Sequence, residues 1–140
     1  MTNINSYLIF NGNCREAMTF YRDCLGGEIY FQTIGESPMA GKLPAEMKES
    51  IMHATLTAGD LKLMGSDMCP ESGLVKGNSV SLLINFNSEE EARTTYEKLS
   101  AGGEKDHPLE NTYWGALFGE LTDKFENHWM FNYERNQNNN

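Results

Sequence analysis

The hydrophobic and polar positions of this chain form short apolar runs and two longer amphipathic stretches. The apolar runs at residues 4–10 and 79–86 are rich in β-branched and aromatic side chains and too short for buried helices, so they predict strands. After each run, apolar residues recur at helical spacing. The predicted apolar stripes are Ala17, Tyr21, Cys24 and Leu25 in the first stretch and Ala92, Tyr96 and Leu99 in the second. Both halves of the chain therefore begin with a strand followed by a helix.

Polar residues mark where the two helices should begin. Ser88 with Glu91 three residues later fits a capping box, in which the serine oxygen accepts a backbone N–H and the glutamate reaches back to the cap. Asn13 with Glu16 fits the same arrangement at the first helix. The glycines expected in the left-handed conformation after the helices are Gly26 and Gly102. These signals bound each helix at both ends.

Three further strands are predicted after each helix, which makes each half a βαβββ unit. The predicted strands are residues 28–34, 52–57 and 61–66 in the first half, and 104–109, 114–121 and 128–133 in the second. Residues 37–50 form an insertion with two prolines and a glycine, which we expect to be a mobile loop able to act as a lid. Residues 68–77 link the halves, and residues 136–140 form a disordered tail.

The two halves also resemble each other in sequence. Residues 10–28 match residues 86–104 at several landmarks, and both stretches end in Gly-Gly-Glu. A half of this size with one helix covers only one face of its sheet, so its other face must meet something else. We therefore predict one α+β domain, residues 1–135, made of two βαβββ modules at about 1–67 and 78–135. The mixed sheets would curve around a cleft, with the helices outside.

Composition and charge restrict the classes of partner. The 140 residues carry 20 Asp and Glu against 11 Lys and Arg, for a formal net charge of −9. So acidic a surface repels phosphate backbones and anionic lipids, which excludes nucleic acid and membrane as expected partners. The three cysteines have no Cys-x-x-Cys spacing, and the first residues carry no secretory signal. We therefore expect a cytoplasmic protein with reduced thiols.

Several motifs in order resemble one branch of a known superfamily. The stretches Tyr-Leu-Ile-Phe-Asn-Gly-Asn-Cys-Arg-Glu-Ala at 7–17 and Ile-Met-His-Ala-Thr-Leu at 51–56 carry the resemblance. So do Met-Gly-Ser-Asp at 64–67 and Trp-Met-Phe-Asn at 129–132. Together they resemble the PhnB-like branch of the vicinal oxygen chelate superfamily, which includes glyoxalase I, bleomycin-resistance proteins and extradiol dioxygenases. One departure is Glu126, which stands where this family usually has glycine after Asp-Lys-Phe.

The resemblance implies paired βαβββ modules, often exchanged between the two chains of a dimer. It implies no single reaction, because members share a cleft and differ in chemistry. A methyltransferase name is attached to some relatives. The sequence, however, has no glycine-rich nucleotide loop opening a βα unit, as S-adenosylmethionine binding would suggest. We therefore do not expect methyl transfer.

Metal-dependent members of the superfamily place a His or Glu on the first and last strand of each module. Strand alternation puts the corresponding positions at Asn5, at Ser81, near residues 65–67, and at Met130 or Asn132. Asparagine, serine and methionine do not make a transition-metal site, which needs imidazole, thiolate or carboxylate ligands. We therefore predict no metal and no other cofactor.

The three histidines are weighed singly, because none has metal-ligand spacing to another. His53 lies in the middle of a predicted strand, where it is either a hydrogen-bonded strand residue or a base or ligand-binding donor in the cleft. For His107, beside Pro108, and His128, beside Trp129, a structural role is the favoured interpretation. His53 is therefore the candidate catalytic residue.

Other side chains are candidates for lining the cleft, each with a structural alternative. Asp67 is either a carboxylate at the cleft mouth or the cap of a turn. Trp114 and Trp129 either stack on a planar ligand or pack in the sheet core, and core packing is favoured. Tyr7 either donates a hydrogen bond to a ligand or buries its ring. The predicted ligand-binding set is Tyr7, His53, Asp67, Ser81, Trp114 and Trp129.

The leading functional hypothesis is a metal-free, dimeric protein that binds a small molecule between its modules. The alternative is a metal-dependent lyase, isomerase or oxidoreductase of the glyoxalase or dioxygenase type, with His53 and either Asp67 or Glu126 as ligands. A third class, a purely structural or protein-interaction module, predicts no enclosed pocket between the sheets. The sequence names neither the ligand nor a reaction.

Overall fold

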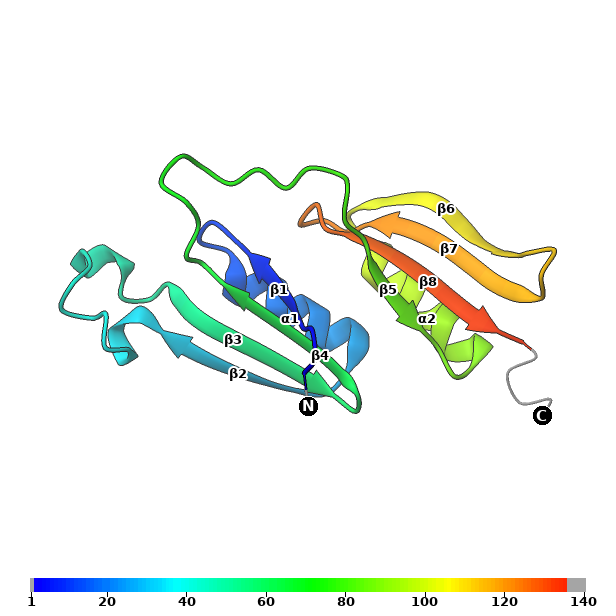
Figure 1. The fold of residues 1–140 in the computed structure, drawn as a ribbon, viewed down its shortest axis with the longest axis horizontal. Coiled ribbons are helices and arrows are strands. Elements are labelled where there is room, and N and C mark those ends of the chain that lie inside the picture. The colour runs from blue at the N-terminus through cyan, green and yellow to red at the C-terminus, as the bar shows by residue number, and fades with distance from the viewer. Residues whose placement is uncertain (1, 136–140) are drawn as a thin grey trace. The chain divides into compact units, whose positions relative to one another are not determined.

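The computed structural model describes residues 2–135 and divides the chain into two compact units, Met1–Val75 and Lys76–Asn140 (Figure 1). The first unit contains β1 (Ser6–Ile9), α1 (Cys14–Leu25), β2 (Glu28–Thr33), β3 (Ile51–Ala58) and β4 (Leu61–Ser66). The second contains β5 (Leu82–Asn85), α2 (Glu89–Ser100), β6 (Glu104–Asn111), β7 (Ala116–Thr122) and β8 (His128–Glu134). The predicted α+β fold of two βαβββ modules is confirmed, whereas the cleft stays a prediction. The tail at 136–140 lies outside the described residues.

The two sheets have the same topology. Their strand orders are β1-β4-β3-β2 and β5-β8-β7-β6. In each, the first strand pairs in parallel with the last strand of its module, and the other pairs are antiparallel. Tyr7 pairs with Met64 in the first sheet as Leu83 pairs with Met130 in the second. The internal repeat in the sequence therefore corresponds to a repeat in structure.

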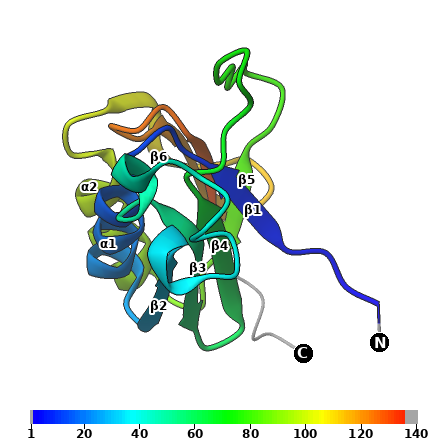
Figure 2. The same cartoon turned by 90° about the vertical axis from the view of Figure 1, so that its left-hand side faces the viewer.

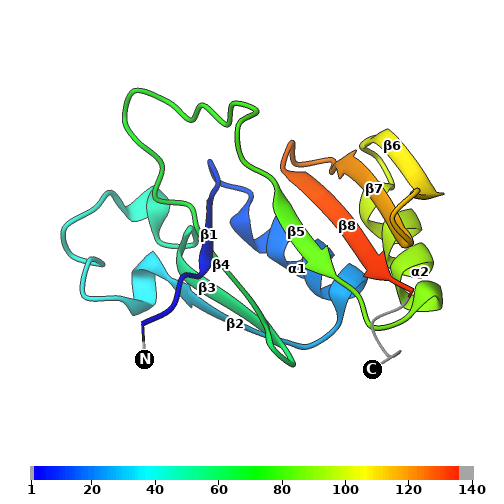
Figure 3. The ribbon, with the colours of Figure 1, turned by 45° about the vertical axis from the view of Figure 1, so that its right-hand side comes forward.

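One face of each sheet packs against the helix of its own module. In the first module, Phe10, Met18 and Leu56 are fully buried between α1 and the sheet. In the second, the ring of Phe131 lies 5.0 Å from that of Phe86 and 5.3 Å from that of Tyr96 on α2. Figure 3 shows α2 along one face of its sheet. Within residues 2–135, the opposite face of each sheet carries no helix of its own module.

The Gly-Gly-Glu repeat has a steric cause in both modules. A Cβ atom on Gly27 would collide with the carbonyl oxygen of Thr57, and one on Gly103 would collide with that of Thr122. The preceding glycines, Gly26 and Gly102, have positive φ of 81° and 79° as predicted. The chain therefore passes from helix to strand at a point that only glycine fits.

Several predicted element ends differ from the structure. The predicted strands at 4–10 and 79–86 shorten to Ser6–Ile9 and Leu82–Asn85. The predicted strand at 114–121 begins only at Ala116, because the Thr112 N–H and hydroxyl both donate to the Ala116 carbonyl and close a turn. Trp114 therefore lies in that turn and not on a strand.

The insertion between β2 and β3 contains short helical turns, visible in cyan to green in Figure 2. Residues Ile34–Glu36 and Ala45–Met47 form single 3₁₀ turns. The first is capped by Thr33, whose hydroxyl accepts from the Glu36 N–H while the Glu36 carboxylate accepts from the Thr33 N–H. The insertion is thus partly ordered by its own hydrogen bonds, and its role as a lid stays a prediction.

Candidate functional site

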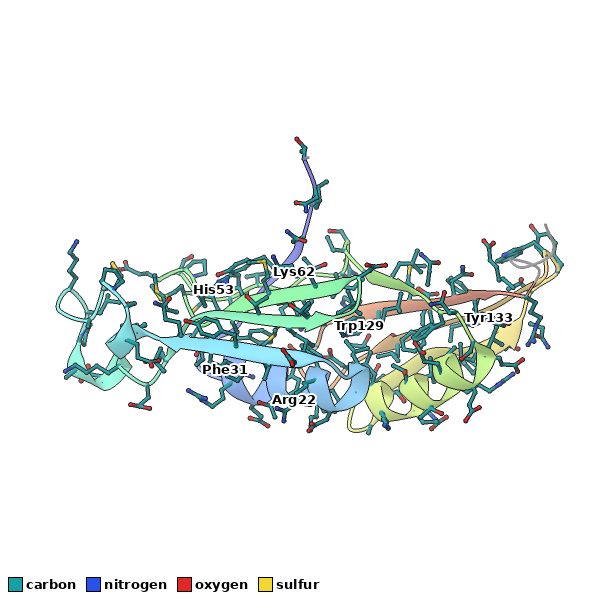
Figure 4. All side chains as sticks on the ribbon, turned by 90° about the horizontal axis from the view of Figure 1, so that it is seen from below. Arg22, Phe31, His53, Lys62, Trp129 and Tyr133 are labelled. Carbon is teal, nitrogen blue, oxygen red and sulfur yellow. The ribbon has the colours of Figure 1, made fainter. Side chains whose placement is uncertain are left out.

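A hydrogen-bonded triad lies on the face of the first sheet opposite α1, which we call the open face. The Tyr7 hydroxyl is 3.3 Å from Nδ1 of His53, and the Thr55 hydroxyl is 3.0 Å from Nε2 of the same ring. The rings of Tyr7 and His53 are also in contact, with centroids 5.9 Å apart. In Figure 4, His53 and Lys62 lie on the side of the sheet away from α1, where Arg22 is labelled.

Strand alternation produces this arrangement. On β3, Ala54 and Leu56 are buried toward the helix, so His53 and Thr55 project from the other face. Tyr7 on β1 is directly beside β4, since it pairs with Met64, which in turn pairs with Thr55 on β3. The triad thus comes from two strands, β1 and β3, with β4 between them, and Tyr7 remains 46% exposed.

The second module does not repeat the triad. Tyr7 and Thr55 both pair with Met64, whereas the residues that pair with the corresponding Met130 are Leu83 and Glu120. The position of His53, two residues before Thr55, is occupied by Phe118, two before Glu120. The same fold is therefore built in the second module without these polar groups. The triad is not required by the architecture.

Asp67 has a structural role in this structure, and this corrects the prediction for the first helix cap. Its Oδ1 accepts from the N–H groups of Gly12 and Cys14, each at 2.9 Å, and its Oδ2 accepts from the Ile51 N–H at 2.8 Å. Asn13, expected to cap α1, makes no side-chain hydrogen bond there. Both carboxylate oxygens of the buried Asp67 are engaged by the backbone, so of the two interpretations the cap is the one the contacts favour.

The Ser88 half of the capping box predicted for the second helix is confirmed. The Ser88 hydroxyl accepts from the Glu91 N–H at 3.0 Å. At this helix end Glu89 also binds two guanidinium groups, those of Arg93 and Arg135. Hydrogen bonds from Arg135 and then Arg93 lower the pKa of the Glu89 carboxyl to about 2. All of these groups stand on the surface of the second module.

Among the remaining predicted residues, Trp129 is core. It is only 2% exposed, and its indole N–H donates to Oδ2 of the equally buried Asp123 at 2.8 Å. Trp114 is 57% exposed in the turn before β7, with its ring 4.8 Å from that of Tyr113. Ser81 is exposed just before β5. Of the predicted ligand-binding set, the structure brings Tyr7 and His53 together within one module.

The other two histidines have local partners in the second module. His128 Nδ1 lies 3.0 Å from the Thr122 hydroxyl, which also donates to Asp106 at 2.7 Å. His107 is exposed, and its Nε2 lies 3.5 Å from the Glu110 carboxylate. These contacts agree with the structural roles favoured for both residues.

A hollow of about 720 Å³ lies in the second module, beside the start of β6, the end of β7 and the start of β8. Charged groups, among them Lys76, Glu104, Asp106 and Glu126, border it. Burial lowers the pKa of the Lys76 ammonium, while the Asp123 and Glu126 carboxylates act in the opposite direction. Small-molecule sites are mostly apolar with a few convergent polar groups, so this charged hollow is the weaker candidate.

The side chains at the superfamily's metal positions do not fit a transition-metal site. Asn5, Ser81 and Met130 offer only neutral donors at those positions, and the Asn132 amide donates to the Asn85 side chain at 3.0 Å. Near residues 65–67 the carboxylate is that of Asp67, which accepts from three backbone N–H groups. Neutral amides, hydroxyls and thioethers are weak ligands for zinc, nickel or iron. Within residues 2–135, no group of three or more His, Cys, Asp or Glu side chains is arranged to hold a metal ion.

Thr55 is the member of the site that the sequence interpretation missed. Its signal was its spacing from His53, because two residues along a strand return to the same face. The spacing does not predict which ring nitrogen of His53 the Thr55 hydroxyl contacts, because that depends on the rotamer of the histidine side chain.

Comparison with known proteins agrees with the fold. Residues 3–131 match the family model of the Glyoxalase/Bleomycin resistance protein/Dioxygenase superfamily. Protein YjdN of Escherichia coli is 31% identical over 96% of this chain and 97% of its own. The crystal structure of protein PA1353 from Pseudomonas aeruginosa is 41% identical, covers 96% of this chain and 98% of its own, and superposes with a TM-score of 0.84.

A further relative supports the branch. The PhnB protein from Bacillus cereus is 26% identical over 94% of this chain and 99% of its own, with a TM-score of 0.73. No helix within the described residues is long and apolar enough to cross a membrane. With two matching modules and a family match over nearly the whole length, the chain belongs to the glyoxalase/bleomycin resistance protein/dioxygenase superfamily, in its PhnB-like branch.

Proposed function

We propose that this protein binds a small molecule against the open face of its first sheet, in the cytoplasm and without a catalytic metal. Tyr7, His53 and Thr55 supply the polar contacts, and the ring of Tyr7 with the side chain of Met64 supplies apolar surface beside them. If a reaction follows binding, His53 is its candidate acid–base group, and its ring exchanges protons with the ligand through the hydroxyls of Tyr7 and Thr55.

The observation that carries this proposal is the asymmetry between the modules. The same sheet positions hold Leu83, Phe118 and Glu120 in the second module, so packing alone does not call for Tyr, His and Thr in the first. The second module shows that the fold does not require Tyr, His and Thr at these positions. Hydrogen-bonded polar groups on an accessible face that the fold does not require are expected of a binding site.

We also propose that a second βαβββ module packs against this open face. A sheet face left without a helix needs another layer, and the corresponding face of another module fits it, from the same chain or from a second copy. Ser81 and Trp114 are then candidates for additional contacts. Sedimentation tests the dimer: a species near 15.8 kDa at micromolar concentration contradicts it, and one of twice that mass supports it.

The metal-free part of the proposal rests on the donor types, and metal analysis tests it directly. Protein purified without chelators should contain no stoichiometric zinc, nickel, manganese or iron. A stoichiometric metal that disappears in His53→Gln would contradict the proposal. His107→Gln, with an exposed ring in the second module, is the matched control.

Ligand binding is tested by thermal denaturation against a metabolite library, with mass spectrometry to identify any compound that co-purifies. A ligand at about 100 times its dissociation constant adds about 2.7 kcal/mol to the unfolding free energy, which is visible as a shift in melting temperature. The shift should fall in Thr55→Val and persist in Thr57→Val. Thr57 is the next threonine of β3 on the same face, and it is exposed. Equal loss in both variants would place the ligand elsewhere.

A further inference from the structure

The hydrogen bonds of the triad restrict the chemistry of its ligand. A neutral His53 ring carries one N–H and one bare nitrogen, and the hydroxyls of Tyr7 and Thr55 carry one hydrogen each. Two of these three hydrogens are used in the two hydrogen bonds to the ring. Whichever tautomer forms, one hydroxyl hydrogen is left over.

The tautomer of the His53 ring decides which hydroxyl keeps a hydrogen that is not used inside the triad. One such hydrogen remains in either tautomer. If Nδ1 is bare, Tyr7 donates to it, Nε2–H donates to Thr55, and the Thr55 hydrogen remains. If Nε2 is bare, Thr55 donates to it and the Tyr7 hydrogen remains. A protonated ring would leave both hydroxyl hydrogens. In every case both ring nitrogens are occupied inside the triad, so the ring presents no bare nitrogen to a ligand.

A positive charge on the same face also favours ligands with acceptor groups. Lys62 lies on β4 two residues from Met64 and is exposed on the same side of the sheet (Figure 4). Glu28 stands in the same row on β2, across Thr57, and two strand spacings separate its backbone from that of Lys62 by about 10 Å. The cation thus attracts anionic and repels cationic ligands near the triad.

We infer that the triad selects a ligand carrying a hydrogen-bond acceptor, a carbonyl or carboxylate oxygen beside an apolar or aromatic body. This inference rests on the proposed binding site and names its ligand class. While the face is open, water accepts the left-over hydrogen. A ligand that covers the face must replace that water, and one without an acceptor leaves a buried donor unpaired.

Three aromatic probes of similar shape test the inference on the full-length protein: benzoate, acetophenone and benzylammonium. Their dissociation constants are measured by shifts of assigned Tyr7, His53 and Thr55 resonances. Benzoate and acetophenone should bind about tenfold more tightly than benzylammonium, since an unpaired donor and a like charge both penalise the amine. The double variant Tyr7→Phe, Thr55→Val removes both hydroxyl hydrogens and leaves the ring with one N–H and one bare nitrogen open to the ligand, so it should reduce this preference. Thr57→Val should leave it unchanged.

The outcomes distinguish an error in the ligand class from an error in the position of the binding site. If benzylammonium shifts the triad resonances with an affinity equal to that of benzoate, the site stands and the acceptor assignment is overturned. If none of the three probes shifts those resonances while the protein remains folded, the proposed site is overturned as well. Retention of the full preference in the double variant would also overturn the assignment, because the left-over hydroxyl hydrogen is then absent.

Discussion

The carboxylate of Asp67 accepts a hydrogen bond at 2.9 Å from the backbone N–H of Cys14, the first residue of α1. Because Asp67 also accepts from the N–H groups of Gly12 and Ile51, it joins the end of β4 to the start of α1 and of β3. The negative charge lies at the helix N-terminus, where the macrodipole favours it. This one side chain therefore replaces the local cap that Asn13 does not provide.

Asp67→Ala should destabilise the protein strongly, because it leaves three backbone donors without their acceptor. We expect a loss of about 3 kcal/mol in unfolding free energy, measured by urea denaturation. Asp67→Asn keeps one acceptor oxygen and should lose about half as much. A loss below about 0.5 kcal/mol in Asp67→Ala would contradict this role and reopen a ligand-binding one.

Gly103→Ala should destabilise the second module, because the added methyl group meets the Thr122 carbonyl oxygen. Overpacking of this kind costs about 1–3 kcal/mol. Gly41→Ala is the matched control, since nothing lies near its Cβ position and its φ is not in the left-handed region. Its stability should be unchanged or slightly higher, because the unfolded chain loses freedom. Equal effects in the two variants would refute the steric explanation of the Gly-Gly-Glu repeat.

Glu126→Gly should stabilise the turn between β7 and β8. Within the described residues, Glu126 is the one non-glycine residue with positive φ, at 71°. Glu126→Ala removes the same carboxylate but keeps Cβ, so comparing the two variants isolates the backbone. The glycine variant should be about 1 kcal/mol more stable than the alanine variant. A glycine variant less stable than the alanine variant would show that the turn is not strained in this way.

The cysteines should differ in reactivity toward thiol reagents. Cys14 is fully buried, and burial, followed by the Asp67 charge, raises the pKa of its thiol to about 12. Its thiolate is therefore scarce at neutral pH. Cys69 is partly exposed in the segment after β4. In the folded protein iodoacetamide should modify Cys69 first, and Cys14 only after denaturant is added, as mass spectrometry would show. Early labelling of Cys14 would contradict the structure.

Much of the fold was predictable because its signals are local. The repeat of apolar runs, the Ser88 cap and the Gly-Gly-Glu ends each depend on neighbouring residues, and each is present in the structure. Alternation along β3 likewise indicates that His53 and Thr55 share a face. The helix cap at α1 could not be predicted in this way, since its acceptor, Asp67, lies 53 residues along the chain from Cys14.

The candidate site was predictable only in part, for a similar reason. Tyr7 and His53 meet because β1 lies beside β4, and this pairing is non-local. Trp129 was a candidate for the cleft with core packing as the favoured interpretation, and the structure has it in the core. It shares a face of β8 with Phe131, two residues along the strand, which is buried against α2. Trp114 was assigned to a strand because the hydrogen bonds of Thr112 that close the turn leave little trace in composition.

The most direct test of the proposed function is the NMR signal of the His53 ring during ligand titration. The three histidines can be labelled selectively, and His53 is assigned through His53→Gln. A small molecule that raises the melting temperature should shift the His53 ring resonances in proportion to occupancy, and Thr55→Val should weaken that response. A molecule that binds the protein and leaves the His53 ring resonances unchanged would contradict the proposal.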